Sequence, residues 1–366
     1  MVDLTARTER LDDYLAATGL DAVWFARPNA FAWLTGGTNA VDRTAPVGVA
    51  AAGYVPGADP SFRAVAPAGE ADRVREEELP EAFAVETVPW HQPLGEAVAE
   101  RSPEAAAADF DAPGLESVDA GTHRQPLAGD DVERYRQLGE ETAAAVERVC
   151  RELSPEDTEH EVASALRITL SSGAIEAPVV RVAGSERAEP YRTPPAGAAR
   201  LGDYAVVSVT AERGGLHASL SRTVTFDPSE AFLEAHRDAA RVEATALAAT
   251  HEAAESGDAG DVFDAVREAY DELGSPDALE RGDQGGAAGF ARREWLATPG
   301  SAQPVSAPMA YAWNPVVGGA RSEDTYLVER GPEPFECLTA TPNWPTETVS
   351  AVGFDREFER HAVYEP

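Results

Sequence analysis

Lysine is absent from this sequence of 366 residues: all 30 basic residues are arginine, against 64 acidic residues and a formal net charge of −34. A chain so poor in cations lacks the basic stripe that nucleic-acid binding needs, so we expect no nucleic-acid partner. Self-repulsion among the carboxylates costs folding free energy at low salt, whereas about 1 M salt shortens the screening length to about 3 Å. Because the acidic residues are dispersed, we interpret them as a solvated surface adapted to a salt-rich cytoplasm; a surface that binds cationic partners is the alternative.

Cysteine is scarce, and long apolar runs are missing. The two cysteines, Cys150 and Cys337, are too few for a disulfide framework or a cysteine-ligated zinc site, so we expect both to be small buried hydrophobic residues. No apolar run approaches the roughly 18 residues that cross a bilayer. Residues 1–7 lack the apolar core of a signal peptide. The sequence therefore predicts a cytoplasmic protein without a membrane partner.

Apolar periodicity divides the chain into two segments. In residues 1–125, short apolar strands alternate with helix-like stretches, which predicts an α/β domain. From 126 to 366, helices and strands come in blocks, which predicts an α+β domain. Helices are expected at 10–19, 28–34, 132–153, 161–171, 229–255 and 260–273, and strands at 21–25, 47–55, 204–209 and 216–221. Residues 105–108 are expected to be helical or loop-like.

Several short motifs follow one another in a characteristic order. Leu-Thr-Gly at 34–36 and Glu-His-Glu-Val at 159–162 precede Gly-Asp at 202–203; Leu-Ser-Arg-Thr at 220–223 and Gly-Ala-Arg-Ser-Glu-Asp-Thr-Tyr-Leu-Val at 319–328 follow. Together they resemble the M24 family, which includes aminopeptidase P, prolidase, creatinase and methionine aminopeptidase. The resemblance covers nearly the whole chain. It implies a creatinase-type α/β N-terminal domain over 1–125 and a pita-bread domain over 126–366, an α+β fold as a whole.

Active members of this family hold two divalent metals with two aspartates, one histidine and two glutamates. When each motif is aligned without gaps, these five positions fall on Ser208, Ser219, Gln284, Asn314 and Glu323. Neutral side chains bind transition metals poorly without a charged partner, and one carboxylate cannot hold two divalent ions. The resemblance therefore implies a cavity that keeps Glu323 but has a degenerate metal site, with no metal ligand assigned.

The two family histidines that assist substrate and transition state align with Tyr191 and Ala291, so no catalytic residue is assigned with them. Arg192, His217 and Arg222 are the candidate ligand-binding residues near the same motifs. Arginine and tyrosine side chains can orient a carboxylate substrate. A lone histidine on a strand is more often a structural residue than a ligand.

Three hypotheses for function remain. The first is a halophilic family member that has lost its metals and peptidase activity and binds a peptide or small molecule in the old cavity, as metal-free pita-bread domains do in histone-chaperone subunits. The second is a metal-free hydrolase of altered chemistry with Glu323 as its base. The third is an active metallo-aminopeptidase acting on X-Pro peptides, which alone would need a cofactor, a dinuclear Mn, Co or Zn centre. By analogy with relatives, a homodimer is expected.

Overall fold

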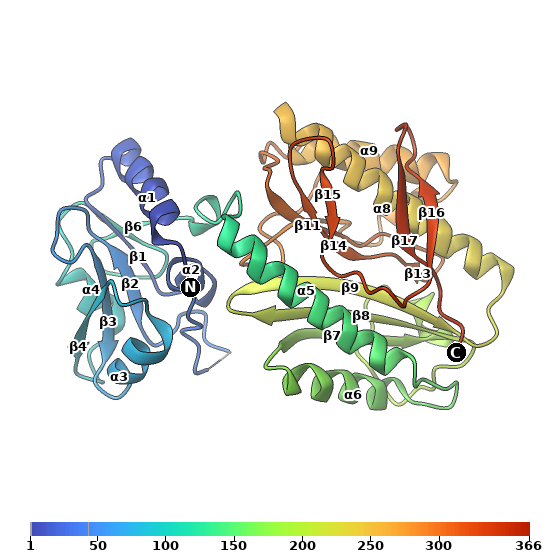
Figure 1. Ribbon diagram of the computed structural model, residues 1–366, viewed down its shortest axis with the longest axis horizontal. Helices are drawn as coiled ribbons and strands as arrows, with labels where there is room; N and C mark the ends of the chain where they lie inside the picture. The colour runs from blue at the N-terminus through green and yellow to red at the C-terminus, as the bar shows by residue number, and fades with distance from the viewer. Residues whose placement is uncertain (1, 43) are drawn as a thin grey trace. The chain divides into compact units, whose positions relative to one another are not determined.

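A computed structural model describes residues 2–42 and 44–366 (Figure 1). The chain forms two compact units, residues 1–132 with Gly214–Leu216, and residues 133–213 with 217–366. The sequence places the domain boundary slightly earlier, at 125/126. The architecture agrees with the expected one: an α/β unit comes first and an α+β unit follows.

Six strands form the mixed sheet of the N-terminal unit, in the order β4-β3-β2-β1-β5-β6. The elements of this unit are α1 (Leu4–Thr18), β1 (Ala22–Phe25), α2 (Pro28–Thr35), β2 (Ala51–Tyr54), β3 (Phe62–Pro67), α3 (Ala71–Arg73), a π-helical turn (Val74–Glu78), β4 (Phe83–Val88), α4 (Leu94–Ala99), β5 (Ala106–Ala108), β6 (Glu116–Ser117) and a 3-10 turn (Ala120–Thr122). The expectation for 105–108 was wrong, because these residues form β5, which pairs in parallel with β1. A buried parallel strand made of alanines has no polar alternation by which the sequence could reveal it.

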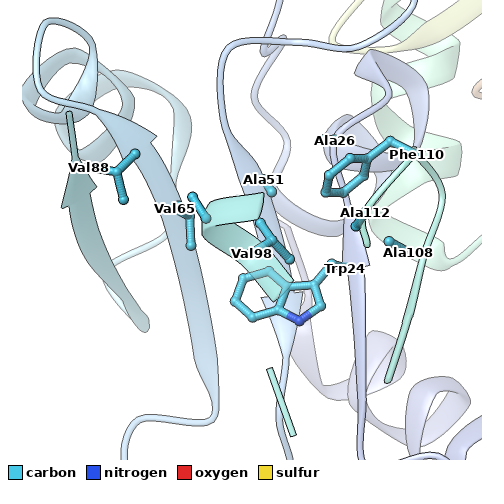
Figure 2. Close-up of a cluster of buried hydrophobic side chains, with 10 residues drawn as sticks. Trp24, Ala26, Ala51, Val65, Val88, Val98, Ala108, Phe110 and Ala112 are labelled. Carbon is cyan, nitrogen blue, oxygen red and sulfur yellow. The ribbon is translucent and has the colours of Figure 1, made fainter. Parts of the chain in front are cut away.

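Trp24 of β1 lies at the centre of the hydrophobic core of this unit (Figure 2). Val98 lies beside its indole ring, and the cluster is completed by small residues such as Ala51 and Ala108 and by Val65. Gly53 lies opposite Trp24 on β2, where a Cβ atom would come within 2.4 Å of the ring. A larger residue at that position would displace the indole.

In the C-terminal unit, two principal sheets, β7-β8-β9 and β10-β11-β14-β15, are accompanied by the pairs β12-β13 and β16-β17. The elements after residue 128 are α5 (Gly129–Cys150), α6 (Glu159–Ser172), β7 (Glu176–Gly184), α7 (Ser185–Ala188), β8 (Tyr204–Arg213), β9 (Leu216–Thr225), α8 (Glu230–Ser256), α9 (Ala259–Glu272), α10 (Pro276–Leu279), β10 (Gly285–Ala288), β11 (Met309–Trp313), β12 (Val316–Val317), β13 (Ala320–Arg321), β14 (Asp324–Val328), β15 (Phe335–Cys337), β16 (Thr346–Ser350) and β17 (Glu357–His361). The expected helices and strands form with shifted bounds: α1 begins six residues before the expected helix, and β8 and β9 each extend four residues past the expected strands.

Polar residues fix where the helices of this unit begin. Thr158 and Asp258 each form a capping box with the residue three positions on, and the Ser229 hydroxyl accepts from the Phe232 amide at the start of α8. Cys150 is buried as expected, whereas Cys337 is only partly buried. In the described part of the chain, none of the helices combines the length and the apolarity that crossing a bilayer would require.

Candidate functional site

Gln284, Asn314 and Glu323 lie in one row across three neighbouring strands. β10 pairs with β11 so that residue 285 faces 313, and β11 pairs with β14 so that 313 faces 324. One residue beyond these pairs, Gln284, Asn314 and Glu323 continue the same row. The Asn314 amide donates a hydrogen bond to the Gln284 carbonyl at 2.9 Å. The strands approach closely because Gly285, with φ of +110°, has no Cβ; one added there would lie 2.2 Å from the Ala312 carbonyl.

Ser208 and Ser219 come from the other sheet, on β8 and β9. The Ser221 hydroxyl donates to Glu323 Oε2 at 2.9 Å, and its oxygen lies 2.7 Å from Ser208 Oγ. Since the only hydroxyl hydrogen of Ser221 goes to Glu323, Ser208 is the donor in the second bond. Ser219 instead pairs with Thr210 at 2.9 Å. A chain of neutral hydroxyl groups therefore leads to the carboxylate at this position.

Arg293 supplies the positive charge beside Glu323. Its Nη2 lies 3.4 Å from Glu323 Oε1, and the two side chains are only 6% and 7% exposed. Burial lowers the pKa of Arg293, while the Glu323 carboxylate opposes that shift. A guanidinium thus already neutralises the carboxylate that family members offer to a metal.

The donor set does not fit a dinuclear divalent centre. Gln284 is occupied on both sides of its amide: Oε1 accepts from the Tyr270 hydroxyl at 2.8 Å, and Nε2 donates to the Gly282 carbonyl at 2.6 Å. Within residues 2–42 and 44–366, no three His, Cys, Asp or Glu side chains gather where they could hold a metal ion. Two adjacent divalent ions need several anionic ligands, and Glu323 is already paired with a cation.

A small cavity of about 20 Å³ adjoins this row, with Ser208 in its wall. That volume holds roughly one water-sized group. The lining residues are Arg181, Ala183, Ala188, Tyr191, Arg192, Pro194, Val206, Ser208, Val316, Gly319 and Arg321. An open hollow of about 640 Å³ shares Tyr191, Arg192 and Pro194 with it. Of the five aligned positions, Ser208 is the one that lines this cavity.

Arginine side chains dominate the electrostatics of the cavity. Arg321 is only 5% exposed and donates to the Arg192 carbonyl at 2.8 Å. Burial lowers the pKa of Arg321 to about 10, a shift that Glu323 opposes and the nearby Arg192 and Arg181 increase. Burial also lowers the pKa of Arg192. The cavity is thus a cationic pocket in a strongly acidic chain.

The remaining candidate residues have different surroundings. Tyr191 is 57% exposed, and Arg192 lines both hollows. The Ala291 carbonyl accepts from the Gly289 amide, and the His217 amide donates to the Gly289 carbonyl. Ala291 has no group that could transfer a proton. Among these candidates, Tyr191 and Arg192 are the ones that could touch a ligand in the cavity.

Arg222 belongs to a separate buried ion cluster and not to the cavity. It donates to Asp324 Oδ1 at 3.0 Å and to the Thr339 carbonyl at 2.6 Å. Asp324 also accepts from Arg360 at 3.0 Å and contacts His361 Nδ1 at 2.6 Å. The expectation that Arg222 meets a ligand therefore fails, because adjacent strand residues point to opposite faces and Arg222 turns away from Ser221.

Sequence reasoning missed Arg181, Arg293 and Arg321. Arg321 lies within the 319–328 motif, where the alignment drew attention to Glu323 two residues later. Arg181 lies directly opposite Ser208 in the pairing of β7 with β8. Basic residues are few in this chain, so arginines that gather in one place indicate a functional role. This scarcity was the signal that could have revealed them.

Comparison with known proteins decides the family. The model of metallopeptidase family M24 matches residues 133–330, and the creatinase/prolidase N-terminal domain matches residues 7–120. The chain belongs to metallopeptidase family M24. A search of curated proteins gave no match.

Solved structures of this family share the fold over nearly the full length of the chain. Dipeptidase PepE from Mycobacterium ulcerans is 19% identical with a TM-score of 0.72, covering 100% of this chain and 99% of that one. The X-Pro aminopeptidase from Thermotoga maritima is 16% identical with a TM-score of 0.72, covering 98% and 99%. The N-terminal domain of the FACT complex subunit SPT16 from chickpea is 11% identical with a TM-score of 0.66, covering 93% and 97%. At these identities the likeness concerns the fold.

Proposed function

We propose that this M24 protein has lost its dinuclear metal site and peptidase activity and serves as a metal-free binding protein adapted to high salt. The ligand would be a small molecule or peptide that enters the open hollow lined by Tyr191 and Arg192, next to the cavity that Ser208 lines. The observation that carries this proposal is the pairing of Glu323 with Arg293 and Ser221 at 3.4 Å and 2.9 Å.

Peptide hydrolysis by this family depends on two cations that polarise the carbonyl and lower the pKa of a bridging water. A guanidinium cannot substitute for them, because it has no open coordination position for water. The serine, glutamine and asparagine at the other four positions add no charge to attract an ion. We therefore expect an X-Pro peptide to remain intact.

The test is an assay of X-Pro dipeptides and longer X-Pro peptides with purified protein in molar KCl, with and without added Mn²⁺, Co²⁺ or Zn²⁺. The expected result is no release of the N-terminal residue above the rate of a buffer blank. Hydrolysis that a chelator abolishes would overturn the proposal in favour of a working metallo-aminopeptidase. Hydrolysis that resists the chelator but disappears in Glu323→Gln would overturn it in favour of a metal-free hydrolase.

A further inference from the structure

Three arginines from three separate elements meet at the cavity beside Ser208. Arg181 comes from β7, Arg192 from the segment after α7, and Arg321 from β13, and all three line the cavity wall. Arg181 stands directly opposite Ser208 in the pairing of β7 with β8. The sheet register thus places Arg181, while Arg192 and Arg321 reach the cavity from two other parts of the chain.

None of these three guanidinium groups forms an ion pair with a carboxylate of the described residues. Arg321 donates to a main-chain carbonyl at 2.8 Å. Arg192 donates through Nη2 to the Asp283 carbonyl and to the Asn314 carbonyl, while its Nη1 is buried without a partner. The Arg181 side chain forms no ion pair and donates no hydrogen bond to a main-chain carbonyl within the described residues. Arg321 is buried whereas Arg181 and Arg192 are half-buried, and burying a cation without an anion is costly, so an anion at this cavity would stabilise the folded chain.

The balance of charge indicates the valence of that partner. The three cavity arginines and Arg293 face two carboxylates, those of Glu323 and Asp283. Arg292 and Arg281 also act on Arg293 and Arg192, so the cations outnumber the carboxylates by more than two. A doubly charged anion would offset more of this excess than a singly charged one, and the planar fork of arginine matches the oxygens of such a group in pairs.

The shape of the hollow indicates what the anion is attached to. The inner cavity, of about 20 Å³, is too small for an organic molecule, so the charged group would lie at its mouth. Outside it, the hollow of about 640 Å³ is lined by Tyr191 and by Pro190, Pro194 and Pro195. Of the two further arginines there, Arg187 pairs with Glu159. Arg281 donates to the Glu189 and Pro190 carbonyls and, like Arg192 and Arg321, forms no ion pair with a carboxylate of the described residues. An aromatic or aliphatic remainder could lie over the tyrosine and the prolines.

We propose that this cavity binds a dianionic oxyanion group of the phosphate monoester type, held by Arg181, Arg192 and Arg321, with its organic part over Tyr191. The same chemistry would admit free phosphate, so the experiment compares the two sources. This proposal names the ligand class of the proposed function and rests on that function.

The test is isothermal titration in molar KCl at constant ionic strength, with inorganic phosphate, sulfate, phenyl phosphate and acetate as separate probes. The expected order of affinity is phenyl phosphate, then phosphate and sulfate, with acetate at least tenfold weaker than phosphate. Equal affinity for phosphate and phenyl phosphate would assign the site to the free ion. Acetate that binds as tightly as phosphate, or no saturable phosphate binding, would overturn the proposal.

The decisive variant is Arg181→Gln, because its side chain supports no other contact within the described residues. It should weaken phosphate binding at least tenfold while the thermal midpoint stays within a few degrees. Arg267→Gln is the matched control, since it removes the same charge from an exposed pair with Asp264 on α9 and should bind as the parent does. Equal binding by both variants would contradict the assignment.

These measurements are separable from the test of the proposed function. If phosphate fails to bind but X-Pro peptides also stay intact, the ligand class is wrong and the metal-free function stands. If the protein proves to be a metal-dependent peptidase, phosphate titration of the chelator-treated protein still decides whether the arginines form an oxyanion site.

Discussion

Glu323 and Asp324 are adjacent at the start of β14 and belong to two regions that differ in charge balance: charges are matched around Asp324, whereas cations are in excess near Glu323. The Asp324 carboxylate contacts the side chains of Arg222, Arg360 and His361. Glu243 belongs to the same cluster, since its carboxylate accepts a hydrogen bond from the Asp324 amide at 2.9 Å. Around Glu323, Arg293 is the paired cation, and three more arginines line the cavity nearby without an ion pair among the described residues.

This difference distinguishes an ion cluster that stabilises the fold from a site that could bind a ligand. A buried carboxylate whose cations are all directly paired with it holds strands in place and has no capacity for a ligand. Arg321 is instead a buried cation without a carboxylate partner among the described residues, which is costly for the folded chain unless an anion from outside neutralises it. The Asp324 cluster therefore fixes β9, β14 and β17, whereas the arginines on the side of Glu323 line a cavity that a ligand could reach.

The largest expected effect is on the scaffold side. Although burial alone would raise the pKa of Asp324, Arg222, His361 and Arg360 hold it well below its usual range. Asp324→Asn leaves Arg222 and His361 without their carboxylate partner, while Arg360 keeps its ion pair with Glu243. The change should lower the free energy of unfolding by about 3–5 kcal/mol. Urea titration in molar KCl measures the change.

The control variant is Asp264→Asn, because Asp264 forms an exposed ion pair with Arg267 on α9. Its loss should lower the free energy of unfolding by less than about 1 kcal/mol. Because the folded-state pKa of Asp324 is depressed, its stabilisation is fully present above the ordinary carboxyl pKa of about 3.8 and is lost as the pH falls below it. A penalty for Asp324→Asn that grows with acidification would contradict this assignment.

On the site side we expect a smaller effect. Arg293→Met should cost about 1–3 kcal/mol because it leaves Glu323 buried with one hydroxyl donor. Adding Glu323→Gln should recover part of this loss, since no unpaired charge then remains. A double-mutant cycle measured by urea unfolding should give a coupling of about 0.5–3 kcal/mol, and strict additivity would show that the pair does not interact.

Much of this architecture could be predicted from the sequence. Motif order indicated the fold, and ungapped alignment placed Gln284, Asn314 and Glu323 on what proved to be one row of strands. Those positions follow from local motifs, which sequence alone can reveal.

The partners of these residues could not be predicted in the same way. Whether Arg293 reaches Glu323 depends on how the segment after β10 turns back, and whether Arg181 faces Ser208 depends on a strand register that no motif specifies. β5 escaped notice because three alanines carry no periodic signal.

The smallest expected effect is the dependence of stability on salt concentration. The thermal midpoint of the whole chain should rise with KCl between about 0.1 and 3 M, since exposed carboxylates are screened. The penalty of Asp324→Asn should change by less than about 1 kcal/mol over the same range, because buried pairs are screened little. A midpoint that stays flat would contradict adaptation to high salt.

The central claim is that the charge of the metal site has been replaced from within the chain. Titration of Mn²⁺ into chelator-treated protein in molar KCl tests it most directly. We predict no saturable binding to the parent chain, and measurable binding once Ser208→Asp, Ser219→Asp, Gln284→His and Asn314→Glu are combined with Arg293→Met. Two saturable Mn²⁺ sites on the unaltered chain, lost in Glu323→Gln, would contradict the account.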